Sequence, residues 1–139
     1  MISKGKCLCG AVELEIELNQ PETQMAACHC SMCRNWLGGP MLTLDSGVLK
    51  SISDESAITR YPSSDWAERG FCSTCGTSLF YYLKPADQYH FAAGLFDGDL
   101  KLKFSHQIFI EEKPDYYSFS NKTQNMTGAE VFAHFESEQ

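Results

Sequence analysis

The chain has 139 residues, of which 43% are hydrophobic, and a formal net charge of −7. This length predicts a single domain over residues 1–139 with one modest core. The negative charge, and the scattering of only 11 Lys and Arg residues, argue against nucleic acid as the main partner. No hydrophobic run approaches the roughly 18–20 residues that cross a bilayer, so no membrane partner is expected.

Short strands are predicted along most of the chain. Residues 11–18 alternate hydrophobic and acidic side chains, so we expect a strand with alternate side chains inward, namely Val12, Leu14, Ile16 and Leu18. Further strands are expected at 24–30, 41–44, 48–52, 58–61, 66–71, 78–83, 90–95 and 106–110, with a turn at 97–99. A helical turn over 31–37 and a short amphipathic helix from about residue 128 complete the pattern, which indicates a mainly β domain.

The seven cysteines all lie in close clusters, at positions 7 and 9, at 28, 30 and 33, and at 72 and 75. Such spacing is most simply explained by metal–thiolate binding, with zinc as the expected ion. The residues before Cys7 lack the hydrophobic stretch of a signal peptide, which favours the cytoplasm. Thiols stay reduced there, so metal binding is favoured over disulfides.

The segment from Cys72 to Gly76 has the Cys-x-x-Cys-Gly pattern of a zinc knuckle, in which a tight turn directs two sulfurs toward one ion. Two ligands do not complete a tetrahedral site, and Cys7 and Cys9 would supply the other two. A closed four-cysteine site of this kind is structural. The alternative for an isolated Cys-x-x-Cys is a redox dithiol, which the absence of a surrounding βαβ pattern disfavours.

Cys28, Cys30 and Cys33 form what we call the three-cysteine claw. Three thiolates on a tetrahedral zinc ion leave one position open for water, substrate or an exogenous thiol. The alternative is that the protein closes this position, with the Cys7/Cys9 pair or with a histidine. In an extended segment the ring of His29 points away from both neighbouring sulfurs, so His106 is the stronger candidate, either as a ligand or as an acid/base.

Other side chains near the clusters could serve either function or structure. Arg34 either neutralises a tri-thiolate zinc or binds a substrate carboxylate, or else it is simply solvated. Tyr116, like His106, is a candidate general base. Glu111 and Glu112 are expected at a solvated strand end. The aromatic residues are expected in the core rather than in a ligand-binding wall: Trp36, Phe80, Tyr81, Tyr82 and Phe96.

The three clusters, in this order and with their flanking residues 5–12, 28–39 and 69–79, resemble the glutathione-dependent formaldehyde-activating enzyme family, which includes centromere protein V-like proteins. The resemblance implies a small Mss4-like (β-tent) fold of short antiparallel strands that is held together by zinc, with two zinc ions. It assigns the structural ion to Cys7, Cys9, Cys72 and Cys75, and the catalytic ion to the claw. It also implies the condensation of glutathione with formaldehyde to S-(hydroxymethyl)glutathione, a carbon–sulfur lyase reaction in reverse.

The chain departs from the family pattern after Lys113-Pro114, where a tryptophan is common and Asp115-Tyr116-Tyr117 stands here. Two hypotheses from different classes follow from the whole sequence. The first is a zinc-dependent lyase-like enzyme that acts on a thiol–aldehyde adduct. The second is a non-catalytic zinc module that binds a protein or a small thiol.

Overall fold

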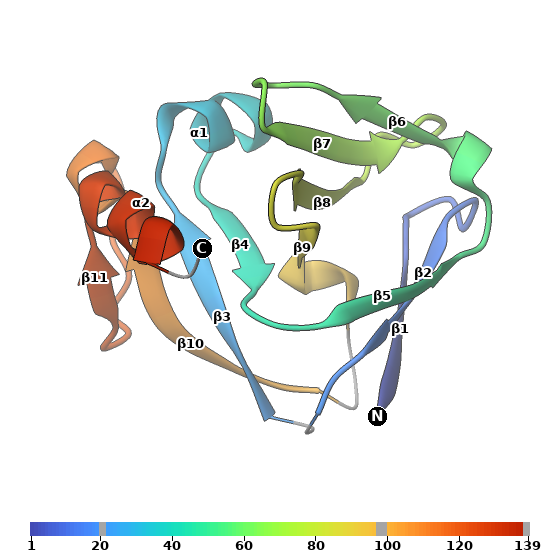
Figure 1. Ribbon diagram of the computed structural model, residues 1–139, viewed down its shortest axis with the longest axis horizontal. Helices are drawn as coiled ribbons and strands as arrows, with labels where there is room; N and C mark the ends of the chain where they lie inside the picture. The colour runs from blue at the N-terminus through green and yellow to red at the C-terminus, as the bar shows by residue number, and fades with distance from the viewer. Residues whose placement is uncertain (20–21, 97–99, 138–139) are drawn as a thin grey trace.

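The computed structural model describes residues 1–19, 22–96 and 100–137, and these form a mainly β protein of three small sheets (Figure 1). The first sheet has the order β1 (Ile2–Lys6), β2 (Glu13–Glu17), β5 (Val48–Ile52). The second has the order β11 (Gln124–Met126), β10 (Lys101–Ile108), β3 (Glu22–Cys28), β4 (Met41–Leu44). The third has the order β6 (Ile58–Tyr61), β7 (Ala67–Cys72), β8 (Ser78–Leu83), β9 (Gln88–Phe91). The mainly β class expected from the sequence is confirmed.

Within the described ranges, two helices and three short 3₁₀ turns connect or flank these strands. They are α1 (Ser31–Leu37), η1 (Glu55–Ala57), η2 (Ala93–Leu95), η3 (Ile110–Glu112) and α2 (Gly128–Ser137). Helix α1 begins three residues after β3 ends, so the chain turns from the end of an inner strand into a helix within the claw segment (Figure 1). No helix among the described residues is long and apolar enough to cross a membrane.

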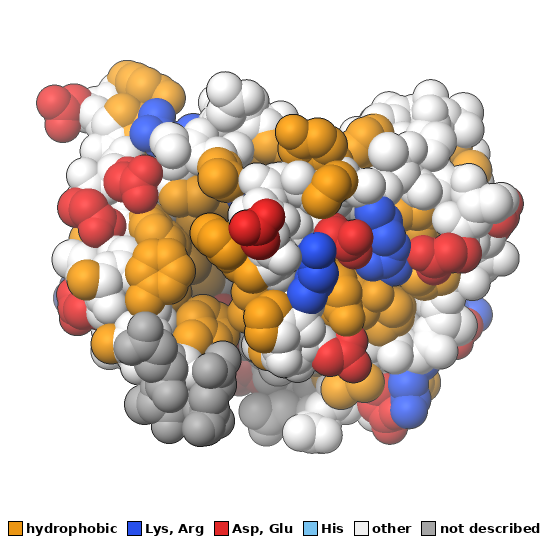
Figure 2. Space-filling view, turned by 45° about the horizontal axis from the view of Figure 1, so that its top comes forward, with side chains coloured by type: hydrophobic (Ala, Val, Ile, Leu, Met, Phe, Trp, Pro, Cys, Tyr) orange, Lys and Arg blue, Asp and Glu red, His pale blue; other side chains and the backbone are white. Residues whose placement is uncertain are grey.

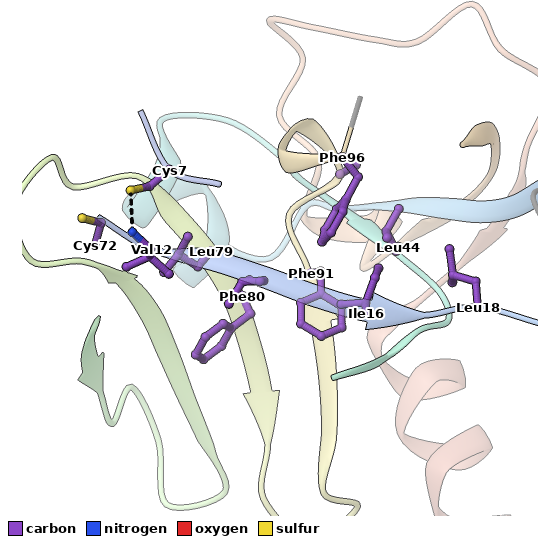
Figure 3. Packing of buried hydrophobic residues seen from close by; sticks show 12 residues of the cluster. Cys7, Val12, Ile16, Leu18, Leu44, Cys72, Leu79, Phe80, Phe91 and Phe96 are labelled. Carbon is purple, nitrogen blue, oxygen red and sulfur yellow. Dashed lines mark hydrogen bonds between the residues drawn. The ribbon is translucent and has the colours of Figure 1, made fainter. Parts of the chain in front are cut away.

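The core lies where side chains of all three sheets meet (Figure 3). The alternation predicted for residues 11–18 is confirmed, because Val12, Leu14 and Ile16 are fully buried and Leu18 is nearly so. Within the third sheet, the Phe80 ring of β8 lies close to the backbone of β7 at Gly70, where a Cβ atom would be 2.3 Å from that ring. This glycine therefore allows the Phe80 ring to pack directly over the backbone of β7.

Several element boundaries differ from the sequence-based expectation. Strand β1 was missed because its inward residues are Ser3 and Gly5, which give no hydrophobic alternation. The polar strand β11 was also missed. The strand expected at 90–95 ends at Phe91, and its remainder forms η2, while the strand expected at 106–110 begins at Lys101 and ends at Ile108. The turn expected at 97–99 lies outside the described residues.

The strand pairing also departs in one place from a wholly antiparallel arrangement. Strand β10 runs parallel to both β3 and β11, with Ile108 opposite Cys28 at the end that leads into the claw. Every other pairing between the named strands is antiparallel in the described part of the chain. The parallel pairing carries the segment after β10 to the same end of the sheet as the claw.

Charged side chains of both signs are interspersed on the face seen in Figure 2, rather than gathered into a basic stripe. Oppositely charged side chains also form ion pairs at the surface, joining Lys4 to Glu15, Lys50 to Glu17 and Arg60 to Glu55. On this face, at least, no continuous basic track of the kind used for nucleic-acid backbones is present.

Candidate metal centres

The structure brings Cys7, Cys9, Cys72 and Cys75 into one cluster whose sulfur atoms all lie within 4.8 Å of one another. Two short turns build it. The first follows β1, where the Gly10 N–H donates to the Cys7 carbonyl at 3.1 Å, and the second follows β7, where the Gly76 N–H donates to the Cys72 carbonyl at 2.9 Å. Gly76 has a φ of +77°, a left-handed conformation that glycine adopts without strain.

The distances within this cluster fit one tetrahedral metal ion. A zinc–sulfur distance of about 2.3 Å places the sulfurs of a tetrahedral site about 3.8 Å apart. The Sγ atoms of Cys7 and Cys9 are 3.6 Å apart, and those of Cys9 and Cys72 are 3.8 Å apart. Cys7 and Cys72 are also part of the hydrophobic core, and the Val12 N–H donates to the Cys7 sulfur at 3.3 Å (Figure 3). The four-cysteine cluster therefore joins the first and third sheets.

Thr77 connects the two turns of this cluster. Its Oγ1 accepts a hydrogen bond from the Leu8 N–H at 3.1 Å and lies 3.1 Å from the Cys75 sulfur. The side-chain hydrogen bond from Thr77 is the largest cause that lowers the pKa of Cys75 to about 5. This sulfur is thus prepared to act as a thiolate, the form that binds a metal.

The claw also forms a cluster, because the sulfurs of Cys28, Cys30 and Cys33 lie within 4.8 Å of one another. Cys28 ends β3, Cys30 precedes the first residue of α1, and Cys33 lies in the first turn of that helix. The Cys30 sulfur accepts a hydrogen bond from the Cys33 N–H at 3.4 Å and so caps the helix. Among the described residues, no other His, Cys, Asp or Glu ligand atom joins this cluster.

The three sulfurs of the claw cannot all carry a charge at such short distances without a cation. Hydrogen bonds from the Cys28 thiol and then the Cys33 thiol lower the pKa of Cys30 to about 2. The same contacts raise the pKa of Cys28, whose hydrogen bond to Cys30 is the largest cause. The three thiols therefore titrate as one coupled group, and a divalent cation would allow all three to be thiolates.

His29 is held away from the claw sulfurs, as an extended backbone requires. Its fully buried ring lies between the hydroxyl of Tyr117, 2.7 Å from Nδ1, and the Oε1 atom of Gln107, 2.8 Å from Nε2. Because Oε1 only accepts, Nε2 donates to it and the Tyr117 hydroxyl donates to Nδ1. Burial is the largest cause that lowers the pKa of His29, so the neutral ring is favoured. His29 therefore anchors the claw segment to β10 and to the loop after η3.

The two acidic residues expected at a solvated strand end instead bind helix N-termini. The Oε1 atom of Glu112 accepts from the Ser31 N–H of α1 at 3.0 Å, and Glu111 accepts from the Gly128 N–H of α2 at 2.9 Å. Carboxylates satisfy free N–H groups and the positive end of the helix dipole at such positions. Glu112 thus helps to fix the helix that carries Cys33.

The cation that contacts the claw is Arg69 rather than Arg34. The Nε atom of Arg34 donates to the His29 carbonyl at 2.9 Å. The Nη1 atom of Arg69 instead donates to the Cys33 sulfur at 3.4 Å, and its guanidinium lies 5.3 Å from the Trp36 ring centroid and 5.1 Å from that of Tyr81. Arg69 is nearly buried, with 5% of its surface exposed.

A cavity of about 550 Å³ is lined by Arg69 and by residues of α1 next to Cys30 and Cys33 in the chain, while the claw cysteines themselves are not among its lining residues. Its lining comes from α1 and from β6, β7 and the chain between them: Ser31, Met32, Asn35, Trp36, Tyr61, Ser63, Arg69 and Phe71. The size falls within the range of small-ligand sites. Trp36 therefore lies at a cavity rather than in the core, whereas Phe80 and Phe96 are core residues as expected.

The two acid/base candidates lie elsewhere. His106 is not part of the claw cluster, and its Nδ1 atom lies 2.6 Å from the Ser105 hydroxyl and 3.6 Å from an Asp45 carboxylate oxygen. Tyr116 is 72% exposed, and it is the next residue, Tyr117, that contacts His29. The contact of Tyr117 with His29 was missed, and Arg69 could be named from the sequence only as one of four cations near the cysteine clusters, without its contact to Cys33. For Arg69, the alternation of β7, which places it on one face with Phe71, was the available signal.

Comparison with known proteins places the chain among relatives of similar length. It is 37% identical over 129 residues to an uncharacterized lyase of Schizosaccharomyces pombe, covering 92% of this chain and 93% of that protein. It is 27% identical to a Halomonas elongata protein provisionally named a glutathione-dependent formaldehyde-activating enzyme, covering 90% of this chain and 85% of that one. A crystal structure of a Rhodobacter sphaeroides protein matches 72% of this chain and 99% of its own, with 26% identity and a TM-score of 0.52.

The family model described as glutathione-dependent formaldehyde-activating enzyme matches residues 2–112, which include both cysteine clusters and the whole of the third sheet. The chain therefore belongs to the glutathione-dependent formaldehyde-activating enzyme family.

Proposed function

We propose that this protein is a zinc-dependent, carbon–sulfur lyase-like enzyme that acts on a thiol–aldehyde adduct. The type reaction is the one in which glutathione and formaldehyde combine to S-(hydroxymethyl)glutathione and separate again. The observation that carries the proposal is the claw, because three sulfurs converge and no fourth ligand atom joins them in the described part of the chain. The family membership and the names of the relatives support the same chemistry.

The proposal includes two zinc ions per chain. Cys7, Cys9, Cys72 and Cys75 would hold a structural ion, and Cys28, Cys30 and Cys33 a catalytic one. When bound in the claw, zinc would act as a Lewis acid that favours the thiolate form of an exogenous thiol. The chain's own residues keep the claw in place: His29 anchors it to β10, Glu112 caps α1, and Arg69 adds a positive charge beside Cys33.

We further propose a single Mss4-like domain over residues 1–139, a cytoplasmic location, and a small thiol such as glutathione as the partner rather than nucleic acid or a membrane. The supporting argument is chemical. Seven clustered thiols bind metal only while they are reduced, which is the state that the cytosol maintains.

The first test is the number of zinc ions per chain in freshly purified, zinc-reconstituted protein, measured by elemental analysis before and after treatment with glutathione and a mild chelator. We expect two ions, one of which is released more readily and responds to the thiol. Two equally inert ions would contradict an open site and favour the non-catalytic zinc module.

The second test is the Cys30→Ser variant, which removes one claw sulfur with little change in shape. We expect it to keep its circular dichroism spectrum and one zinc ion, and to lose the acceleration of S-(hydroxymethyl)glutathione formation measured by NMR exchange. Loss of the fold in this variant would make the claw a structural site, and full activity would refute its catalytic role.

A further inference from the structure

Arg69 carries a charge that the described carboxylates do not neutralise. Only 5% of its surface is exposed, yet none of the ion pairs among the described residues includes it. Arg60, one strand away, is paired with both Glu55 and Glu68. A buried cation without a carboxylate partner is costly unless another anion lies nearby. The group that Arg69 contacts here is the Cys33 sulfur of the claw, which would be an anionic thiolate once a metal is bound.

The guanidinium of Arg69 is held rigidly and still has donors to spare. Its Nε atom donates to the Ser63 hydroxyl at 3.1 Å, its Nη1 atom donates to Cys33, and the rings of Trp36 and Tyr81 pack around it. These two bonds use two of the five N–H groups of a guanidinium. The residue lines the cavity beside the claw, so the remaining donors are available to a ligand there.

We propose that Arg69 is a catalytic residue that binds the anionic oxygen formed when a thiol adds to an aldehyde. This inference rests on the proposed function and assigns it a further residue. In the forward direction a lone pair of the thiolate sulfur forms the S–C bond, the π pair of the carbonyl moves to oxygen, and the resulting alkoxide takes a proton from water. In reverse, hydroxide removes the hydroxyl proton of the adduct to give water, the alkoxide re-forms the carbonyl, and the S–C electron pair leaves with the thiolate sulfur. Arg69 donates hydrogen bonds to the oxygen and keeps its own protons.

The charge balance of the claw supports this role. Three thiolates and one zinc ion together carry a net charge of minus one, which would repel an alkoxide. The adjacent guanidinium brings the total to zero and presents N–H groups to the cavity side. Preorganised donors of this kind stabilise negative charge that develops in a transition state, and Arg69, with 5% of its surface exposed, holds its donors in a largely buried position at the wall of this cavity.

The binding test compares two thiols on the zinc-loaded full-length protein by calorimetry. Mercaptoacetate carries an anionic oxygen near its sulfur, and propanethiol does not. We expect the wild-type protein to bind mercaptoacetate about 10- to 100-fold more tightly, because the hydrogen bond to Arg69 is charge-assisted. Arg69→Met should lose this preference. Equal preference in Arg69→Met and in the wild type would overturn the proposal.

Arg60→Met is the matched control. Arg60 is also surrounded by aromatic rings, those of Phe80, Tyr82 and Tyr89, but it pairs with Gly70 and so lies on the opposite face of the sheet from Arg69. It should keep the thiol preference. If Arg69→Met does not fold, Arg69→Lys takes its place. Lysine keeps the positive charge but lacks the planar guanidinium with its several N–H donors, so this variant should retain only part of the preference for mercaptoacetate.

Two further measurements separate this inference from the proposed function. Arg69→Met should lower kcat for the adduct about 100-fold or more; normal kcat would refute the role of Arg69 while the function stands. Benzoate, an oxygen anion without a thiol, should shift the Nε–H NMR signal of Arg69. If no thiol binds the wild type, the proposed function fails, and the benzoate shift alone decides whether Arg69 is an anion site.

Discussion

Replacing Cys72 with serine tests the structural centre most directly. Cys72 is fully buried and belongs both to the four-cysteine cluster and to the hydrophobic core. If no metal were bound, the change would bury one hydroxyl in place of a thiol and cost about 1–3 kcal/mol. A structural zinc ion contributes on the order of 10 kcal/mol of folding free energy. Because whole domains are stable by about 5–15 kcal/mol, losing most of that contribution would unfold the protein.

The assay is urea unfolding followed by circular dichroism, with zinc counted in parallel. We expect Cys72→Ser to be unfolded or aggregated without denaturant and to contain little zinc. Cys30→Ser, at a half-buried cysteine of the claw, is the comparison and should unfold cooperatively. A Cys72→Ser protein that is folded and retains two zinc ions per chain would refute the assignment of the four-cysteine cluster as the structural site.

Three other changes test the surroundings of the two centres. Tyr117→Phe removes the donor to Nδ1 of buried His29 and should lower the free energy of unfolding by about 1–3 kcal/mol in urea titrations; an unchanged midpoint would show that this bond does not anchor the claw. Gly70→Ala places a Cβ 2.3 Å from the Phe80 ring and should cost at least about 1–3 kcal/mol, whereas Gly39→Ala, with open space around it, should not. Acidification from about pH 8 to pH 4 should release zinc, because ligand thiolates take up protons as pH falls; constant zinc content on dialysis would contradict thiolate ligation.

Local pattern predicted those strands whose inward side chains are hydrophobic. The alternation around Leu14 and Ile16 located β2 because burial requires one face of the strand to be apolar. Strand β1 buries Ser3 and Gly5 instead, so its position depends on pairing with β2 and has no hydrophobic signature. The start of β10 was different: Lys101 to Phe104 do alternate, and that signal was present but not used.

The grouping of the cysteines was accessible from sequence because two ligands one to three residues apart must face the same point. The supports of the claw were not accessible in this way. His29 and Tyr117 are 88 residues apart, and Ser31 and Glu112 are 81 apart, so their contacts depend on how β10 pairs with β3. A parallel pairing between distant strands leaves no periodic pattern in either segment, and the helix-capping role of Glu112 follows from that pairing.

The same reasoning explains why the sequence pointed to Arg34 and the structure to Arg69. Arg34 is near the claw along the chain, but its guanidinium turns back to the His29 carbonyl. Arg69 reaches Cys33 because β7 places alternate residues on opposite faces, with Arg69 toward the claw and Cys72 in the four-cysteine cluster. One short strand therefore touches both centres. Loss of metal at the structural site should therefore displace Arg69 from the claw as well. Loss of metal from the claw should leave the structural site intact, because the claw ligands come from β3, α1 and the residues between them.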